Sequence, residues 1–219
     1  MVQAIKKINI SQKDKMKIGA KMKLELGLLS IALALSISGC GDAPIAHGKN
    51  DKTPYATKEC NQQLRLGQEI VASEKIDTIV VYKGKRTLTT YRNGSEVNSY
   101  RMSLGAKGGA NGGNKVKAGD YRTPEGTYKI VRKKCDNRLY KSLMISYPNT
   151  SDKARASAAG VRPGGYITIH GQPKWNADGR GDSYTLSRDW TEGCMAIPNR
   201  AMDTLWRAVE NGVKIEIHA

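Results

Sequence analysis

Two short segments of the chain contain residue types that could carry out acyl transfer through a thiol. The first is a β-branched run that ends in His170-Gly171, and the second contains Gly193-Cys194. The thiolate form of a cysteine is the nucleophile, and a nearby imidazole can take the proton from the thiol. The predicted chemistry is therefore nucleophilic catalysis by Cys194, with His170 as its general base.

The small number of histidines narrows the choice of base. His47 lies in a polar N-terminal region and His218 is the penultimate residue, so His170 remains. A glycine before the cysteine permits a tight turn, in which the N–H groups of Gly193 and Cys194 could face a developing oxyanion. One cysteine and one histidine taken alone also fit a structural interpretation, as a small buried thiol and a strand-end imidazole.

A metal site is the competing use of histidine and cysteine. Such a site needs three or four ligands at close spacing, and the sequence has no Cys-x-x-Cys or His-x-x-x-His pattern. We therefore expect neither a metal nor a cofactor.

The elements that must position these residues are mostly strands. Helices are expected at 60–74, at 151–159 and at 200–210, the last capped by Asn199 and ended by Asn211-Gly212. β-branched and aromatic runs predict strands at 76–82, 86–91, 96–104, 127–132, 143–147, 166–170 and 213–217. The sequence thus predicts a mainly β fold over residues 75–219, a β-sandwich or open barrel with a few peripheral helices.

The first forty residues have the features of an export signal. Seven lysines precede an apolar run at 28–37, which is too short to span a bilayer comfortably, and Ser38-Gly39-Cys40 follows. We expect a signal peptide at 1–39, a lipidated Cys40, and a tether with a short helix over 40–74. A signal anchor with a chance cysteine is the alternative, and translation could also begin at Met16 or Met22.

The net charge of the chain is +16, of which residues 1–39 contribute +5, with seven lysines and two acidic residues. The remaining +11 (16 − 5) could favour an acidic polymer, an anionic lipid surface or simple solubility. No basic helix, zinc-finger spacing or aromatic RNA-binding motif accompanies the charge, so nucleic acid is not expected as a partner.

Two further cysteines, Cys60 and Cys135, are left as an even pair. In an oxidising compartment they could form a disulfide that joins the N-terminal arm to the domain. The alternative is two free thiols.

Several motifs together resemble the L,D-transpeptidase catalytic-domain family, also called the YkuD-like fold. They are His170-Gly171, the run Thr191-Glu192-Gly193-Cys194-Met195, and the run Gly119-Asp120-Tyr121-Arg122-Thr123-Pro124-Glu125-Gly126-Thr127-Tyr128. The resemblance implies that Cys194 attacks the amide after the L-centre of diaminopimelate in peptidoglycan stem peptides. It further implies that the Gly171 carbonyl orients His170, and that the acyl-enzyme passes to an amine or to water.

Two positions depart from the common family pattern. Many members have histidine where this chain has Glu192, and arginine where it has Ala196. The run Asp-Trp-Thr-x-Gly-Cys-x-Ala instead resembles a Gram-negative branch that includes an enzyme releasing the major outer-membrane lipoprotein from peptidoglycan. The departures leave the acceptor open.

Three functions are consistent with these residues. The first is an L,D-transpeptidase, and the second is a hydrolase of the same bond type, an amidase or L,D-carboxypeptidase. The third is a non-catalytic wall-binding lipoprotein. The absence of Cys194 or His170 would favour this third function, but both residues are present. The expected partners are stem peptides, a membrane reached through the lipid and a wall-anchored lipoprotein. Gly41 after Cys40 favours the periplasmic face of the outer membrane over the inner membrane.

Overall fold

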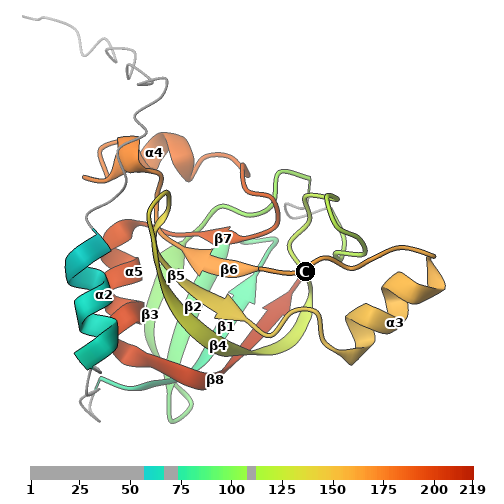
Figure 1. Cartoon of the computed structure of the whole chain (residues 1–219), viewed down its shortest axis with the longest axis horizontal. Helices are drawn as coiled ribbons and strands as arrows, with labels where there is room; N and C mark the ends of the chain where they lie inside the picture. Colours follow the sequence, from blue (N-terminus) through green and yellow to red (C-terminus); the bar gives the residue numbers. More distant parts are fainter. Residues whose placement is uncertain (1–56, 67–73, 108–111) are drawn as a thin grey trace, which may run out of the picture. The chain divides into compact units, whose positions relative to one another are not determined.

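The described strands belong to one eight-stranded sheet, in the order β3-β2-β1-β8-β4-β5-β6-β7 (Figure 1). The computed structural model describes residues 57–66, 74–107 and 112–219. The predicted signal peptide, Cys40 and most of the predicted tether lie outside these residues. No helix in the described ranges is long and apolar enough to cross a membrane.

The elements follow one another closely along the chain. The strands are β1 (Ile76–Tyr82), β2 (Thr87–Arg92), β3 (Ser95–Arg101), β4 (Gly126–Asp136), β5 (Tyr140–Ile145), β6 (Thr168–His170), β7 (Met195–Ala196) and β8 (Val209–His218). The helices are α2 (Thr57–Leu66), α3 (Thr150–Ala158), the 3₁₀ turn η1 (Lys174–Asn176), α4 (Asp182–Thr185) and α5 (Asn199–Ala208). The prediction of a mainly β fold with few helices is confirmed.

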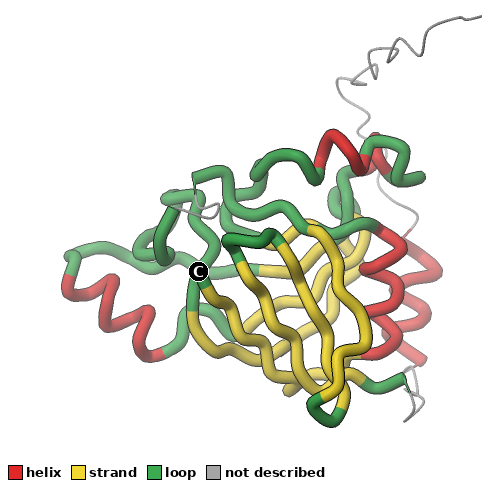
Figure 2. The backbone as a smooth tube through the Cα atoms, turned by 180° about the vertical axis from the view of Figure 1, so that it is seen from behind, coloured by secondary structure: helices red, strands yellow, loops and turns green. Residues whose placement is uncertain are grey.

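The sheet is mixed and strongly curved. Most neighbouring strands are antiparallel, but β1 pairs with β8 and β6 pairs with β7 in parallel. The long strand β4 pairs with β8 through residues 126–129 and with β5 through residues 130–136. A strand shared in this way can bend between its two halves, so the sheet curls as an open barrel does (Figure 2).

The curl brings the chain after β3 against the far edge strand β7. Ser103 and Ala196 exchange both backbone hydrogen bonds, each 2.9 Å long. A second bridge joins Gly105 to Thr191. We call this junction of residues 103–105 with residues 191–196 the seam. Of the two architectures predicted, the open barrel is the one formed, because the described strands make one sheet that nearly closes on itself.

The core lies inside the curl and under α5. Alternate residues of the strands point inward, as the period of two requires, and Ile79, Val81, Ile215 and Ile217 are all buried. Figures 1 and 2 show α2 and α5 side by side along one side of the sheet. The amphipathic α5 buries Leu205 and Trp206 in this core.

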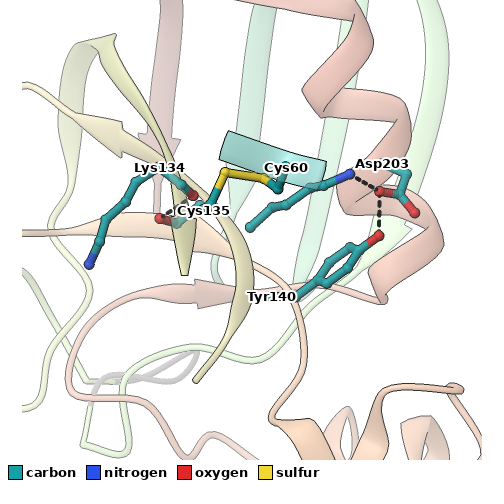
Figure 3. The surroundings of a disulfide bond; sticks show 7 residues. Cys60, Lys134, Cys135, Tyr140 and Asp203 are labelled. Atoms are coloured by element: carbon teal, nitrogen blue, oxygen red, sulfur yellow. Dashed lines mark hydrogen bonds and ion pairs between the residues drawn. A yellow bond between two sulfur atoms is a disulfide. The ribbon is translucent and has the colours of Figure 1, made fainter. Parts of the chain in front are cut away.

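A disulfide connects the N-terminal arm to the sheet. Cys60 of α2 is bonded to Cys135 of β4, 75 residues further along the chain. Figure 3 shows this bond near the hydrogen bond of 2.7 Å that the Tyr140 hydroxyl donates to Asp203 of α5. The disulfide therefore fixes α2 beside β4, and α5 contacts β5, the strand paired with β4.

Several predicted boundaries are wrong for identifiable reasons. Asn199 does not cap α5 as predicted: Pro198 holds that position, and the Asn199 side chain instead accepts the Gln172 N–H at 2.8 Å. The helix ends at Ala208, and Asn211-Gly212 lies within β8 instead of preceding a strand. These two residues lie between Val209 and Lys214, where the register of the β1–β8 pairing shifts, and Gly212 has φ +95°, so their turn tendency appears as an irregularity inside the strand. The N-terminal helix begins at Thr57 where residue 60 was predicted, and residues 67–73 of the predicted range 60–74 lie outside the described residues. The elements η1 and α4 were not predicted.

Reduction of the disulfide should destabilise the domain. A cross-link over 75 residues removes conformational freedom mainly from the unfolded chain, which stabilises the folded state by about 2–4 kcal/mol. We expect dithiothreitol to lower the free energy of unfolding in urea by that amount. The Cys60→Ser/Cys135→Ser double variant should have the same free energy of unfolding as the reduced protein, and dithiothreitol should not change it. Equal stability of the oxidised and reduced protein would contradict the expectation.

Candidate active site

The parallel pairing of β6 and β7 places His170 beside Cys194. Ile169 is opposite Met195 and His170 is opposite Ala196, so Cys194 lies at the start of β7, next to Thr168. Thr168 and His170 are two residues apart and share one face of β6. Parallel neighbours need a crossover connection. Residues 171–194 form that connection, and it carries η1 and α4.

The imidazole of His170 is buried and held in one tautomer. Its Nδ1 lies 2.7 Å from the carbonyl oxygen of Gly171, and the side chain is only 1% exposed. A carbonyl oxygen can only accept, so Nδ1 must carry the proton. Nε2 is then the unprotonated nitrogen of the neutral ring, which is the form a general base requires.

The thiol of Cys194 is partly exposed and surrounded by polar atoms. Thr168 Oγ1 donates to Sγ at 3.5 Å, and the Tyr166 carbonyl oxygen lies 3.8 Å from Sγ. Burial raises the pKa of the Cys194 thiol. A hydrogen bond with His170, the charge that His170 carries when protonated and hydrogen bonds with Thr168 outweigh burial, so the pKa lies below its ordinary value. The site thus favours the nucleophilic thiolate.

A hydrogen-bonded turn presents the thiol. The Thr191 hydroxyl donates to the Cys194 carbonyl at 2.7 Å and accepts the Gly193 N–H at 3.2 Å. The Gly193 N–H is thus engaged inside the turn, and its predicted part in an oxyanion site is not supported by this geometry. The Cys194 N–H, which donates to no described residue, stays the candidate. Glu192 is exposed on the turn.

Gly193 permits a close approach of two backbones. Its φ is +121°, and a Cβ there would lie 2.6 Å from the carbonyl oxygen of Arg122. Gly105 is packed in the same way: its Cβ would lie 2.3 Å from the carbonyl oxygen of Tyr121 and 2.9 Å from the Gly193 Cα. The segment 121–122 therefore lies directly against the turn that carries the thiol, which explains glycine at both positions.

An ion pair anchors the approach to the turn. Arg86 donates two hydrogen bonds to the Asp189 carboxylate, at 3.1 and 2.8 Å, and the Leu104 N–H donates to the same carboxylate at 3.0 Å. The backbone continues the contact, since Thr191 donates to Leu104 O and Ala106 donates to Thr191 O. Residues 189–191 are therefore fixed to the backbone of residues 104–106, which follows β3 and overlaps the seam.

The structure brings together the residues that sequence reasoning singled out at the thiol: His170, Gly171, Thr191, Gly193 and Cys194. Thr168 was missed, although its place two residues before His170 on a predicted strand could have indicated it. Arg86 was also missed, and no local signal points to it because its partner lies 103 residues away. The described residues contain no group of three or more side chains suited to hold a metal.

A family model described as the L,D-transpeptidase catalytic domain matches residues 76–217. The chain belongs to the L,D-transpeptidase catalytic-domain family. The match begins at β1 and ends one residue before the end of β8, so all eight strands of the sheet lie within it or at its edge. Cys194 and His170 therefore lie within a domain whose family is described as catalytic.

Individual relatives are more distant. The chain is 28% identical over 187 residues to YafK of Escherichia coli strains K12 and O157:H7, whose name describes it provisionally as an L,D-transpeptidase. The match covers 83% of this chain and 63% of YafK, so the chain spans less than two thirds of that relative's length.

Solved structures of similar fold include the helical cell shape determining protein Pgp2 from Campylobacter jejuni, with 22% identity and a TM-score of 0.49 over 65% of this chain and 47% of that one. Bd1075 from Bdellovibrio bacteriovorus has 24% identity and a TM-score of 0.46 over 68% and 50% of the two chains. An L,D-transpeptidase from Mycobacterium smegmatis has 12% identity and a TM-score of 0.45 over 65% and 58%.

Replacing Gly193 by alanine should damage both stability and the site. The new Cβ would meet Arg122 O at 2.6 Å in a backbone conformation that alanine rarely adopts. Overpacking and backbone strain together predict a loss of about 3 kcal/mol. Gly212→Ala is the matched control, because Gly212 also has positive φ (+95°) but open space around its Cβ position. That variant should lose only about 1–2 kcal/mol. Equal losses in urea unfolding would refute the close-approach explanation.

Proposed function

We propose that this protein is a cysteine-dependent acyltransferase of peptidoglycan stem peptides, acting through an acyl-enzyme at diaminopimelate. The observation that carries the proposal is the pair formed by the partly exposed Cys194 thiol and the buried His170 imidazole. The hydrogen bond from Nδ1 to the Gly171 carbonyl leaves Nε2 as the nitrogen that can take the thiol proton, and contact with His170 lowers the pKa of Cys194. Membership of the L,D-transpeptidase catalytic-domain family supports the choice of substrate class.

The geometry suggests a balanced two-step reaction. The Cys194 sulfur attacks the amide carbonyl carbon while the thiol proton moves to Nε2 of His170. The carbon–nitrogen bond then breaks, and the leaving amine takes the proton from the imidazolium. In the second step an amine or a water molecule attacks the thioester and gives its proton to His170. The sulfur leaves and regains a proton, which restores the starting enzyme.

Hydrolysis is the second outcome of the same chemistry, since water and an amine compete for one thioester. Glu192 and Ala196 stand where many family members have histidine and arginine, and they belong to the run Asp189–Ala196 that resembles the lipoprotein-releasing branch. We therefore propose that a stem peptide linked to a wall-anchored lipoprotein is one substrate, released by an amidase reaction. Retention of both Cys194 and His170 disfavours a role limited to wall binding.

Loss of either reacting residue should abolish turnover while the fold persists. Cys194→Ser keeps the shape with a much poorer nucleophile, and His170→Ala removes the base, at a cost of about 10²–10⁴-fold. The double variant should be no worse than the poorer single variant, because the two residues act as a unit. His218→Ala, on an exposed histidine of β8, is the matched control and should keep full activity.

The assay uses disaccharide tetrapeptide, with and without an added amine, and a lipoprotein-linked muropeptide. Mass spectrometry separates the products: cross-linked or amine-exchanged species indicate transfer, and a loss of alanine or lipoprotein with gain of water indicates hydrolysis. Full activity of Cys194→Ser, with circular dichroism showing a native fold, would overturn the mechanism.

We further propose that a lipid on Cys40 holds the domain at the periplasmic face of the outer membrane, after removal of a signal peptide at 1–39. The support is the order of positive, apolar and small residues before Cys40. Within the predicted segment 40–74, the part before α2 would be the tether that lets the catalytic domain at 75–219 reach peptidoglycan from the membrane, because the Cys60–Cys135 disulfide fixes α2 to the domain.

Removal of the lipidated thiol should release or arrest the protein. Cys40→Ala should give unprocessed or soluble protein in cells, since the acceptor for the lipid is absent. Detergent partitioning and intact mass measure both outcomes, and Cys194→Ser serves as the control that keeps Cys40. Unchanged mass and partitioning of Cys40→Ala would refute lipidation.

A further inference from the structure

One aromatic residue of the turn touches the imidazole. The rings of Trp190 and His170 meet edge to face, with centroids 5.7 Å apart and planes inclined by 64°. Edge-to-face pairs at this distance are attractive and directional, which limits how far either ring can rotate. The Trp190 ring thus adds a restraint on His170 to the hydrogen bond with the Gly171 carbonyl.

Trp190 is itself held from both neighbours along the chain. Asp189 accepts the two hydrogen bonds of Arg86 and that of the Leu104 N–H. On the other side, the Thr191 backbone pairs with Leu104 and Ala106 across the seam. The backbone that carries the Arg86 side chain is fixed in turn, because Arg86 O accepts the Met102 N–H at 3.0 Å and the Arg86 N–H donates to Lys83 O at 3.0 Å. The backbone of Trp190 therefore has little freedom to move.

The indole N–H has no part in this arrangement. Trp190 Nε1 is buried, and no described residue accepts its hydrogen bond. An unsatisfied buried donor costs about 1–3 kcal/mol, so the N–H does not explain the residue. What the side chain contributes at this position is the face and edge of a large ring, packed against His170.

We propose that Trp190, fixed by the Arg86–Asp189 ion pair, is the positioning residue of His170, holding the imidazole with Nε2 toward the Cys194 thiol. Trp190 acts on the thiol through the imidazole, and its indole N–H makes no hydrogen bond with a described residue. The inference rests on the proposed function, in which His170 takes the thiol proton. The Gly171 hydrogen bond holds the ring at Nδ1, and the indole adds a second, directional contact with the ring as a whole.

The test measures the thiol without any substrate. Thiolate reacts with iodoacetamide and thiol does not, so the alkylation rate of Cys194 against pH reports how well His170 stabilises the thiolate. Wild type should alkylate at lower pH than His170→Ala, because contact with His170 lowers the pKa of Cys194. Trp190→Leu should shift the profile toward that of His170→Ala. A shift of one pH unit makes alkylation about tenfold slower at pH 6.

Three further variants separate positioning from bulk and from folding. Trp190→Phe keeps an aromatic ring without the N–H and should restore the wild-type profile. Arg86→Gln leaves the indole in place but loosens its support, and it should give an intermediate profile even if Trp190→Leu fails to fold. Trp175→Leu removes a tryptophan whose ring pairs with Tyr184 and should match wild type.

The outcomes distinguish the two proposals. Identical profiles for wild type and His170→Ala would overturn the proposed function itself, since His170 would not act on Cys194. If those two differ but folded Trp190→Leu and Arg86→Gln both follow wild type, only the positioning role of Trp190 is overturned. A Trp190→Phe profile equal to that of Trp190→Leu would also overturn it, because an aromatic ring would then not suffice.

Discussion

Two backbone hydrogen bonds between Ser103 and Ala196 are the constraint on which the rest of this site depends. They join one end of a curled sheet to the other, and everything placed near the thiol is attached on one side of that junction or the other. β6 brings His170 and β7 brings Cys194 from the far end of the sheet. The chain after β3 brings the backbone that supports Asp189 and Thr191. Without closure, the backbone of residues 103–106 and the turn that carries Cys194 would belong to opposite ends of an open sheet.

The closure also explains why small residues crowd there. Where the two ends of the sheet meet the segment 121–122, backbone packs directly on backbone. The space at positions 105 and 193 is therefore too small for any side chain, and both positions are glycine. The thiol is consequently carried on a turn that packs against main chain at Gly105 and Arg122, in addition to the side-chain hydrogen bonds of Thr191 and the Arg86–Asp189 ion pair. Such support suits a nucleophile that must keep its position relative to an imidazole through two chemical steps.

Much of this could be predicted from the sequence, and the reasons are local. β-branched runs predicted the strands, and the motif residues His170 and Cys194 were identifiable from their types and neighbours. What failed depends on distant partners. Asn199 has the composition of a helix cap, but it bonds the Gln172 backbone, 27 residues away. Asn211-Gly212 has the composition of a turn, but it lies inside β8, at the register shift between Val209 and Lys214 in the pairing with β1. The Arg86–Asp189 pair spans 103 residues and leaves no periodic or local trace.

The parallel pairing of β6 and β7 has an evolutionary consequence. Its crossover, residues 171–194, starts beside the base and ends at the nucleophile, and both ends are fixed by strand pairing and by the seam. Closing a loop costs only about 0.6 kcal/mol more for each doubling of its length. The interior of the crossover can therefore change in length with little loss of folding free energy. A lineage can thus change the interior of the crossover while the pair of reacting atoms stays in register.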